Sequence, residues 1–363
     1  MNLLLDNIIF SLQRAGGASV VWQQHLERLL KDDSFKCKFL EYDNAVDNFF
    51  RKNLSLKNDT VNILDSKYLF LKRYINLYSK AKDEHIFHSS HYRVEKAKNV
   101  INITTVHDFT YEYFVKGLAR KVHSFQKNLA INSSDGIICI SESTKKDLLR
   151  FLPHIKQEKI KVIYNGVDKT FRVLEDNEIL EKKHPFEDYN YLLYVGDRKS
   201  IHKNFRMVVE ASALSKIPLL LVGGGQLTEE ENQILKKKIG LANFKWLTGV
   251  SVEHLNYYYN KAYCLLYPSL YEGFGIPVIE AQRAGCPVVS TDCSSIPEVI
   301  GNIYLAVKEP TAQKITNKIL ELSINSSLRK ESVDMGFEKS KNFSWDKTYK
   351  ETTNFYKELY FEK

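Results

Sequence analysis

The sequence lacks the features of several large protein classes. Its 363 residues include only five cysteines, and no two of them form a Cys-x-x-Cys pair. This argues against a disulfide framework and against a structural zinc site, and it favours a reducing cytosol. No uninterrupted apolar run approaches the roughly 20 residues that a membrane-spanning helix needs. Asp6 and Asn7 interrupt the apolar residues near the N-terminus, which predict a first strand rather than a signal peptide.

The Asp-x-Asp spacing and dense positive charge are also missing. No Asp-x-Asp occurs in the chain. Enzymes that hold Mg²⁺ or Mn²⁺ on such a pair are therefore disfavoured, and we expect no metal and no other cofactor. The net charge of +8 is modest, and no basic module predicts nucleic-acid binding. An anionic substrate or an anionic membrane surface fits this charge as well.

What the chain does contain is an alternation of short apolar runs and helical stretches. In the first half, strands are predicted at 8–12, 86–88, 99–106, 136–140 and 161–164, and a helix capped by Ser19 at 19–30. The polar stretch 175–190 is a candidate linker. Strands are then predicted at 191–195, 219–222, 244–247, 262–267 and 287–290. Two successive βαβ series predict two doubly wound domains that bind ligands at their strand ends, in a cleft between domains.

The most informative segment is 271–280. Glu272 and Glu280 bracket a corner in which Gly273 and Gly275 permit backbone angles closed to other residues. Pro277 suits the first position of a helix. We therefore expect Glu272 on a loop and Glu280 in the first turns of a helix. The free N–H groups at that helix start would favour a diphosphate.

A basic loop and a glycine run follow two of the predicted strands. Arg198 and Lys203 are the best pair to hold a diphosphate, because both can donate charge-assisted bonds. The alternative is a solvated basic loop, and the position at a strand end favours function. Gly223 begins a run that lacks the third glycine of the dinucleotide fingerprint, since Thr228 stands there. It is a loop that approaches ribose or phosphate, or a plain tight turn.

Three other positions are open to two interpretations. His107 follows a predicted strand and could bond a sugar hydroxyl or move a proton, or it could satisfy a loop carbonyl. Gly16 and Gly17 could be only a turn. The stretch 248–251, which contains Val250, is an ordinary turn on its own.

Taken together, these residues resemble a known family. Glu272 and Glu280, separated by seven residues within Tyr-Glu-Gly-Phe-Gly-Ile-Pro, are similar to the signature of family-four retaining glycosyltransferases of the GT-B fold. Matching stretches cover nearly the whole chain in the right order: 14–17, 106–108, 140–143, 164–168, 194–196, 203–204, 295–298 and 343–345. The stretches 106–110 and 268–271 most resemble the mannosyltransferase branch that builds bacterial surface polysaccharides.

The resemblance implies an α/β architecture of the GT-B type, with two Rossmann-like doubly wound domains facing a central cleft. The N-terminal, acceptor-binding domain would span residues 1–170. The domain that binds the nucleotide sugar would span 171–343. A C-terminal helix, 344–363, would cross back to the N-terminal domain.

The resemblance also implies roles for the motif residues. Glu280 would bind the nucleotide ribose, and Glu272 would face the hydroxyl groups of the donor sugar. Backbone N–H groups would contact the sugar and phosphates from Gly273, Phe274 and Gly275.

The remaining roles fall on other loops. Arg198 and Lys203 would hold the diphosphate, and His107 would contact the donor sugar. The positions expected to offer backbone contacts are Gly16 and Gly17 for the phosphates, Gly223 for ribose or phosphate, and Val250 for the base. Many relatives carry Gly-Asp-Gly where this chain has three glycines from 223 to 225.

We therefore expect a metal-independent retaining glycosyltransferase that moves mannose from GDP-mannose to a lipid-linked or oligosaccharide acceptor in O-antigen or capsule synthesis. It would be cytoplasmic and peripheral on the inner face of the cytoplasmic membrane. Alternatives are the donors UDP-glucose, UDP-galactose, UDP-N-acetylhexosamine and dTDP-rhamnose, a sugar-nucleotide epimerase or phosphorylase, and a non-catalytic sugar-nucleotide-binding subunit. The segment 68–78, flanked by Lys67, Lys80 and Lys82, could rest on an anionic bilayer or could be an ordinary amphipathic helix.

Overall fold

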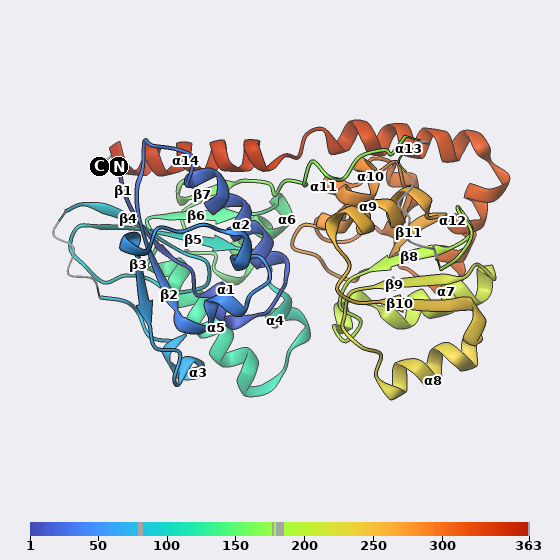
Figure 1. The fold of residues 1–363 in the computed structure, drawn as a ribbon, viewed down its shortest axis with the longest axis horizontal. Helices are drawn as coiled ribbons and strands as arrows, with labels where there is room; N and C mark the ends of the chain where they lie inside the picture. Colours follow the sequence, from blue (N-terminus) through green and yellow to red (C-terminus); the bar gives the residue numbers. More distant parts are fainter. Residues whose placement is uncertain (79–82, 176–177, 179–184, 362–363) are drawn as a thin grey trace. The chain divides into compact units, whose positions relative to one another are not determined.

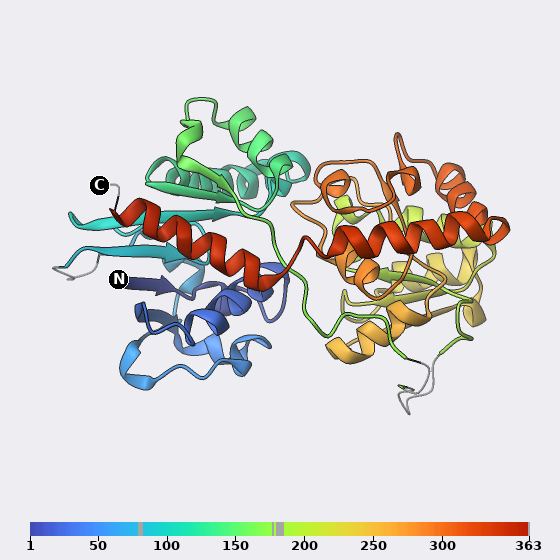
Figure 2. The ribbon, with the colours of Figure 1, turned by 90° about the horizontal axis from the view of Figure 1, so that it is seen from above.

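The chain forms two compact units (Figures 1 and 2). The computed structural model describes residues 1–78, 83–175, 178 and 185–361. Half of the predicted linker 175–190, and both Lys80 and Lys82, therefore lie outside the described residues. Unit 1 comprises Met1–Gly166 and Trp345–Lys363, and unit 2 comprises Val167–Ser344. The sequence predicts domain bounds after residues 170 and 343, and the units divide after Gly166 and Ser344.

Unit 1 is built on a seven-stranded sheet in the order β3-β2-β1-β4-β5-β6-β7, with every neighbouring pair parallel. Its strands are β1 (Asn2–Asp6), β2 (Lys36–Tyr42), β3 (Val61–Leu64), β4 (His85–Ser89), β5 (Val100–Val106), β6 (Gly136–Cys139) and β7 (Ile160–Val162). Its helices are α1 (Ile9–Leu12), α2 (Gly17–Leu29), α3 (Leu69–Lys72), α4 (Thr110–Phe114), α5 (Gly117–Asn132), α6 (Glu142–Phe151) and α14 (Trp345–Phe361).

Unit 2 is built on a six-stranded sheet in the order β10-β9-β8-β11-β12-β13, again with all pairs parallel. Its strands are β8 (Leu192–Val195), β9 (Leu219–Val222), β10 (Phe244–Leu247), β11 (Cys264–Tyr267), β12 (Val288–Thr291) and β13 (Ala306–Val307). Its helices are α7 (Phe205–Ser215), α8 (Glu229–Lys238), α9 (Val252–Lys261), α10 (Ile276–Arg283), α11 (Ile296–Val299), α12 (Ala312–Ile324) and α13 (Ser326–Ser340). Full burial of β9, β11 and β12 accounts for their continuous apolar sequences.

The predicted strands are confirmed at nine of their ten positions, and the exception is 8–12. The strand near the N-terminus is β1, and 9–12 is the short helix α1. The chain turns at Asn7, whose side chain donates to Glu41 and accepts from Trp22, so the apolar residues beyond it cannot continue the strand. Strands β2, β3 and β13 were not among the predictions.

The predicted cap of α2 is also wrong. Gly16 occupies the N-cap position, and Ser19 lies buried inside the helix. The Ser19 hydroxyl accepts hydrogen bonds from Gln13 and Asn48. Ser19 therefore fixes the loop before the helix from within instead of capping its first turn.

The last helix belongs to unit 1, as the predicted fold requires. Phe355 and Tyr356 of α14 join the buried core that also contains residues of β1, β4 and β5. The Tyr356 hydroxyl lies 2.5 Å from Nδ1 of His88 and 3.0 Å from Nε2 of His25. A helix from the far end of the chain therefore completes the packing of the first sheet (Figure 2).

Candidate active site

The carboxyl ends of parallel strands meet at one edge of a sheet, and in unit 2 the predicted site residues lie on the segments that follow those ends. Lys203 follows β8, Glu272 follows β11, and Glu280 lies in α10. Gly223 follows β9 and Val250 follows β10. The sheet thus places five of the predicted positions at one edge of unit 2.

Lys203 and Glu272 form an ion pair in this edge. The Lys203 ammonium donates to both carboxylate oxygens of Glu272, at 2.7 and 2.9 Å, and lies 3.1 Å from the hydroxyl of Tyr267. The two side chains are only 18% and 9% exposed. Burial and the Glu272 carboxylate raise the pKa of Tyr267 well above its ordinary value, so this hydroxyl stays protonated. A cation and a carboxylate predicted from separate motifs are therefore in direct contact.

The glycine corner after Glu272 is held by serine hydroxyls. Ser294 accepts the backbone N–H of Glu272 at 2.8 Å, and Ser295 donates to the carbonyl oxygens of Glu272 and Phe274. Gly275 is the N-cap of α10, with φ of +100°. A Cβ atom there would lie 3.1 Å from Ile296, so both the backbone angle and the packing require glycine. Pro277 occupies the second position of α10, one residue after the first position that the sequence predicts for it.

Glu280 lies inside α10, half-buried, and accepts a hydrogen bond from the Tyr259 hydroxyl at 2.9 Å. Burial raises the pKa of Glu280 from 4.5 to about 7, and Asp168 adds to the rise while Tyr259 opposes it. Hydrogen-bond donors such as ribose hydroxyl groups would stabilise the ionised form of this carboxylate.

Arg198 occupies a different place from the one expected of a diphosphate ligand. Its side chain is fully buried, and Nε donates to Glu231 at 3.1 Å. Its other nitrogens donate to the carbonyl oxygens of Gly223, Gly224, Gly225 and Gln226. All three guanidinium nitrogens are thus engaged inside unit 2, and the diphosphate contact of Arg198 stays a prediction.

The glycine run after β9 is shaped by this arginine. Gly223, Gly224 and Gly225 have φ of +90°, +70° and +71°, which brings their carbonyl groups together on one side. Glu231, the partner of Arg198, also closes a capping box with Thr228 at the start of α8. The run is therefore an ordered, left-handed loop anchored on a buried ion pair, a feature that the sequence did not reveal.

The backbones expected to contact the base and the phosphates lie at the starts of two helices. Val250 is half-buried in the turn before α9, whose N-cap is Ser251. Gly16 and Gly17 begin α2 in unit 1, and a Cβ atom on Gly16 would lie 2.5 Å from the end of the Gln13 side chain. Contacts of these backbones with a nucleotide sugar stay predictions.

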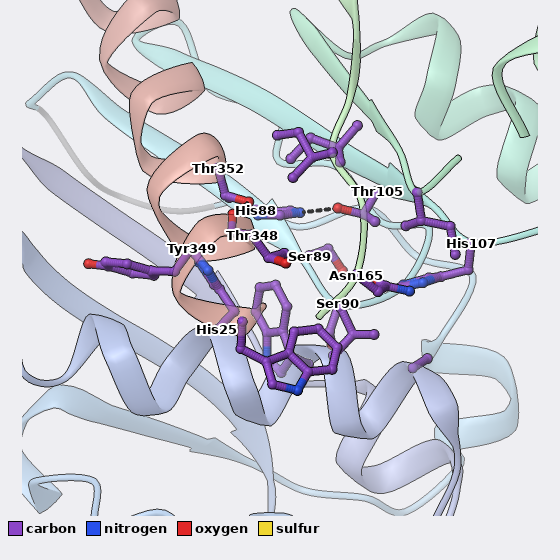
Figure 3. A pocket seen from close by; sticks show the side chains of 17 residues that line it. His25, His88, Ser89, Ser90, Thr105, His107, Asn165, Thr348, Tyr349 and Thr352 are labelled. Carbon is purple, nitrogen blue, oxygen red and sulfur yellow. Dashed lines mark hydrogen bonds between the residues drawn. The ribbon is translucent and has the colours of Figure 1, made fainter. Parts of the chain in front are cut away.

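His107 lines a small cavity in unit 1 (Figure 3). The cavity has a volume of about 40 Å³ and lies among the ends of β4, β5 and β6, helix α2 and helix α14. Its polar lining includes His25, His88, Ser89, Ser90, Thr105, His107, Asn165, Thr348 and Thr352. Sequence reasoning found only the histidine at 107. The other polar residues come from α2, β4, β5, α14 and the segments that follow β4 and β7, which are far apart in the sequence.

The cavity histidines are neutral. Burial lowers the pKa of His25 to about 4, and it lowers the pKa of His88 and of His107 as well. Contacts of 3.0, 2.5 and 2.9 Å connect His25, Tyr356, His88 and Thr105 in a chain. Neutral imidazoles at this edge suit hydrogen bonds with hydroxyl groups better than the binding of an anion.

Metal ligands do not gather in the described parts of either unit. Among residues 1–78, 83–175, 178 and 185–361, no three His, Cys, Asp or Glu side chains are grouped so that they could hold a metal ion.

Comparisons with known proteins identify the family. Residues 175–338 match the family of glycosyl transferases group 1, and residues 45–171 match glycosyltransferase family 4. The chain therefore belongs to the glycosyltransferases that these two families describe. The two matched segments fall mainly within unit 2 and unit 1, respectively.

Named relatives are similar over part of their length. The O-antigen chain mannosyltransferase B of Escherichia coli is 28% identical over 295 residues, which cover 76% of this chain and 75% of the relative. The O-antigen chain mannosyltransferase RfbU of Salmonella typhimurium is 30% identical over 223 residues, which cover 60% of this chain and 59% of the relative. The second alignment thus spans about three fifths of the relative.

Solved structures share the fold at low identity. Sucrose-phosphate synthase from Thermosynechococcus elongatus superposes with a TM-score of 0.76 at 18% identity over the full length of both chains. WaaG, a glycosyltransferase involved in lipopolysaccharide biosynthesis, gives 0.71 at 13% identity over 98% of this chain and 99% of its own. These neighbours establish the GT-B fold with its two Rossmann-like domains.

Replacing Arg198 by lysine will destabilise unit 2 even without a ligand. Lysine keeps the charge but cannot reach four carbonyl groups and Glu231 together, so we expect a loss of about 2–4 kcal/mol in unfolding free energy. Urea unfolding of the free protein measures it. Arg206→Lys, at an exposed pair with Glu230, is the matched control and should unfold like the wild type. Equal stability of the two variants would contradict the anchoring role.

Replacing Glu280 by glutamine will stabilise the protein at alkaline pH. The folded pKa near 7 exceeds the unfolded value, so the contribution of Glu280 is present below about pH 4.5 and is lost as pH rises through 7. We expect Glu280→Gln to be more stable than the wild type by about 2 kcal/mol at pH 8, with the gap closing toward pH 5. Thermal unfolding at both pH values tests this. An offset independent of pH, as expected for the exposed control Glu210→Gln, would refute it.

Proposed function

We propose that this chain is a retaining, metal-independent glycosyltransferase that moves mannose from GDP-mannose to a lipid-linked or oligosaccharide acceptor of a bacterial surface polysaccharide. The relatives named O-antigen chain mannosyltransferases support the sugar and the class of product. One observation carries the proposal: the Lys203 ammonium and the Glu272 carboxylate meet at the strand-end edge of unit 2. In this pair, Lys203 can bind a diphosphate and Glu272 can accept hydrogen bonds from sugar hydroxyl groups.

In the proposed reaction, the bond between the anomeric carbon and the diphosphate oxygen breaks as the acceptor oxygen bonds to the same face of the sugar. The acceptor proton passes to the departing diphosphate, which gives retention without a protein nucleophile. Lys203 neutralises the negative charge that develops on the diphosphate. When Lys203 turns to the phosphates, Glu272 becomes available to accept hydrogen bonds from the sugar.

Glu280 serves the nucleotide in this proposal. Its carboxylate accepts hydrogen bonds from the ribose hydroxyl groups. These bonds stabilise the ionised form of the carboxylate, which burial disfavours. Arg198 acts through the glycine loop after β9 in this proposal, because Nη1 and Nη2 donate to carbonyl groups of that loop while Nε donates to Glu231. The diphosphate then depends on Lys203 and on backbone N–H groups, with electrostatic stabilisation in place of a metal ion.

A panel of nucleotide sugars tests the donor. GDP-mannose should raise the unfolding temperature more than UDP-glucose, UDP-galactose, UDP-N-acetylhexosamine or dTDP-rhamnose, because a ligand of the folded state stabilises it by mass action. With an acceptor, NMR of the product should show the anomeric configuration of the donor, and EDTA should leave the rate unchanged. Epimerised nucleotide sugar formed without any acceptor would overturn the transferase proposal.

Replacing Lys203 by alanine will slow sugar transfer. Loss of one preorganised charged donor should lower kcat by about 10²–10³-fold. Steady-state kinetics measure this, and thermal unfolding checks that the variant folds, since Glu272 loses its partner. Lys199→Ala, on the same loop with an exposed side chain, is the matched control and should keep wild-type turnover. Unchanged kinetics in Lys203→Ala would refute its role.

We also propose that unit 1 rests on an anionic membrane surface. In the segment 68–78, large apolar or aromatic side chains are mostly exposed: Tyr68, Phe70, Leu71, Tyr74, Ile75 and Tyr78. Leu118 and Phe125 of α5 are 75% and 70% exposed, and Gln126 donates to the carbonyl of Arg73, which joins α5 to this segment. Such exposure favours an external apolar partner over an amphipathic helix packed on its own sheet. No helix in the described residues is both long and apolar enough to cross a bilayer.

Vesicle binding tests this surface. The variant Phe70→Ser/Leu118→Ser/Phe125→Ser should bind vesicles that contain anionic lipid at least about tenfold more weakly, because each change removes an apolar side chain from the interface. Cosedimentation with vesicles measures the affinity. Ile324→Ser changes a side chain that is 85% exposed in unit 2, and it should bind like the wild type. Equal binding of the triple variant would contradict the proposed surface.

A further inference from the structure

A fully buried lysine lies next to the loop that carries His107. Lys127 of α5 has no exposed side-chain surface, and its ammonium donates to Glu112 of α4 at 2.7 Å. It also donates to the backbone carbonyl of Asp108 at 3.0 Å. The ring of Phe109 lies beneath it, with its centroid 4.2 Å from the ammonium. One buried cation therefore contacts three residues in the segment 108–112.

Burial of this charge needs a reason. Burial lowers the pKa of Lys127, while Glu112 and Asp108 oppose that effect. A buried ion pair contributes little more to stability than an apolar pair of the same shape. What an apolar pair cannot supply is the hydrogen bond to the Asp108 carbonyl. The distinctive effect of the lysine is thus the placement of that peptide group.

The anchored carbonyl lies one residue after His107. The Asp108 side chain accepts the backbone N–H of Thr110 at 2.9 Å, and the Glu112 side chain accepts the hydroxyl of Ser124 at 2.6 Å. The first bond fixes the turn that begins α4, and the second ties α4 to α5. His107 itself has its side chain in the lining of the cavity, together with Asn165 and Ser90 (Figure 3).

We propose that Lys127 is a positioning residue, which fixes the Asp108 peptide so that the His107 side chain is held at the cavity. Lys127 is too buried to touch a substrate and acts only through the backbone that follows β5. The geometric part of this proposal stands on the contacts in unit 1. Its kinetic part rests on the proposed function, together with the sequence-based expectation that His107 contacts the donor sugar.

The test separates positioning from stability. Lys127→Met alone leaves the Glu112 charge buried without its ion-pair partner, and this loss of stability is unrelated to positioning. The double variant Lys127→Met/Glu112→Gln removes both charges and keeps the acceptor for Ser124. Arg51→Met/Glu41→Gln is the matched control, because it neutralises another mostly buried ion pair of unit 1 and keeps the acceptor for Asn7.

The first readout is local and needs no activity. Histidine ring signals are followed by NMR after ¹³C labelling, and the His107 signal is assigned by its loss in His107→Gln. In the lysine double variant, we expect the His107 signal to shift or broaden while those of His25 and His88 stay in place. In the control, all three should keep their positions. A wild-type His107 signal in the folded lysine variant would overturn the proposal.

The second readout is kinetic. A misplacement of about 1 Å can cost about 10²-fold in rate, so we expect the lysine double variant to lose about 10- to 100-fold in kcat with a smaller change in the KM of the donor. The control double variant should retain its rate. Wild-type kcat in the lysine variant would overturn the kinetic part. If the wild type transfers no sugar at all, the proposed function fails, while the NMR result still decides the geometry.

Discussion

Buried cations that bind backbone carbonyl groups hold the loops at the strand ends of both sheets. A loop that turns its carbonyl groups inward needs donors there, since an unpaired buried acceptor costs free energy. Arg198 supplies them to the glycine loop of unit 2, and Lys127 supplies one to the Asp108 peptide of unit 1. Arg93, which is also buried, binds side chains instead, namely the Asp6 carboxylate at the end of β1 and the Tyr42 hydroxyl. Internal charges therefore help to hold the loops at the strand ends of both sheets.

This arrangement separates two kinds of cation. Arg198 and Lys127 are almost completely shielded from solvent and organise backbone, whereas Lys203 is partly exposed and pairs with a carboxylate through its side chain. An ion pair of the second kind can open for a ligand at modest cost, because solvent and phosphate oxygens can replace the lost partner. The first kind cannot open without leaving several groups unpaired.

The sequence predicts the parts that depend on local pattern. Short apolar runs bounded by turn residues located the central strands, and the Glu272 and Lys203 motifs were correctly placed beyond strand ends, which parallel pairing brings together. It could not separate helix from strand in 8–12, where a brief apolar run suits both. The sequence also could not show that Arg198 is buried, because the same basic loop sequence can be exposed to solvent or folded into the protein. No sequence pattern marks Lys127 as an anchor, because its partners Glu112 and Asp108 lie 15 and 19 residues away along the chain.

Unit 1 is built from two separate segments of the chain, and this determines which unit is completed first during translation. When residue 344 leaves the ribosome, unit 2 has all of its chain, but unit 1 still lacks α14. Until that helix emerges, the cavity has no wall from Trp345, Thr348 and Thr352, and His88 has no Tyr356. Unit 1 is thus completed only after unit 2, and translation that stops within α14 would release a chain with a finished second unit and an unfinished first.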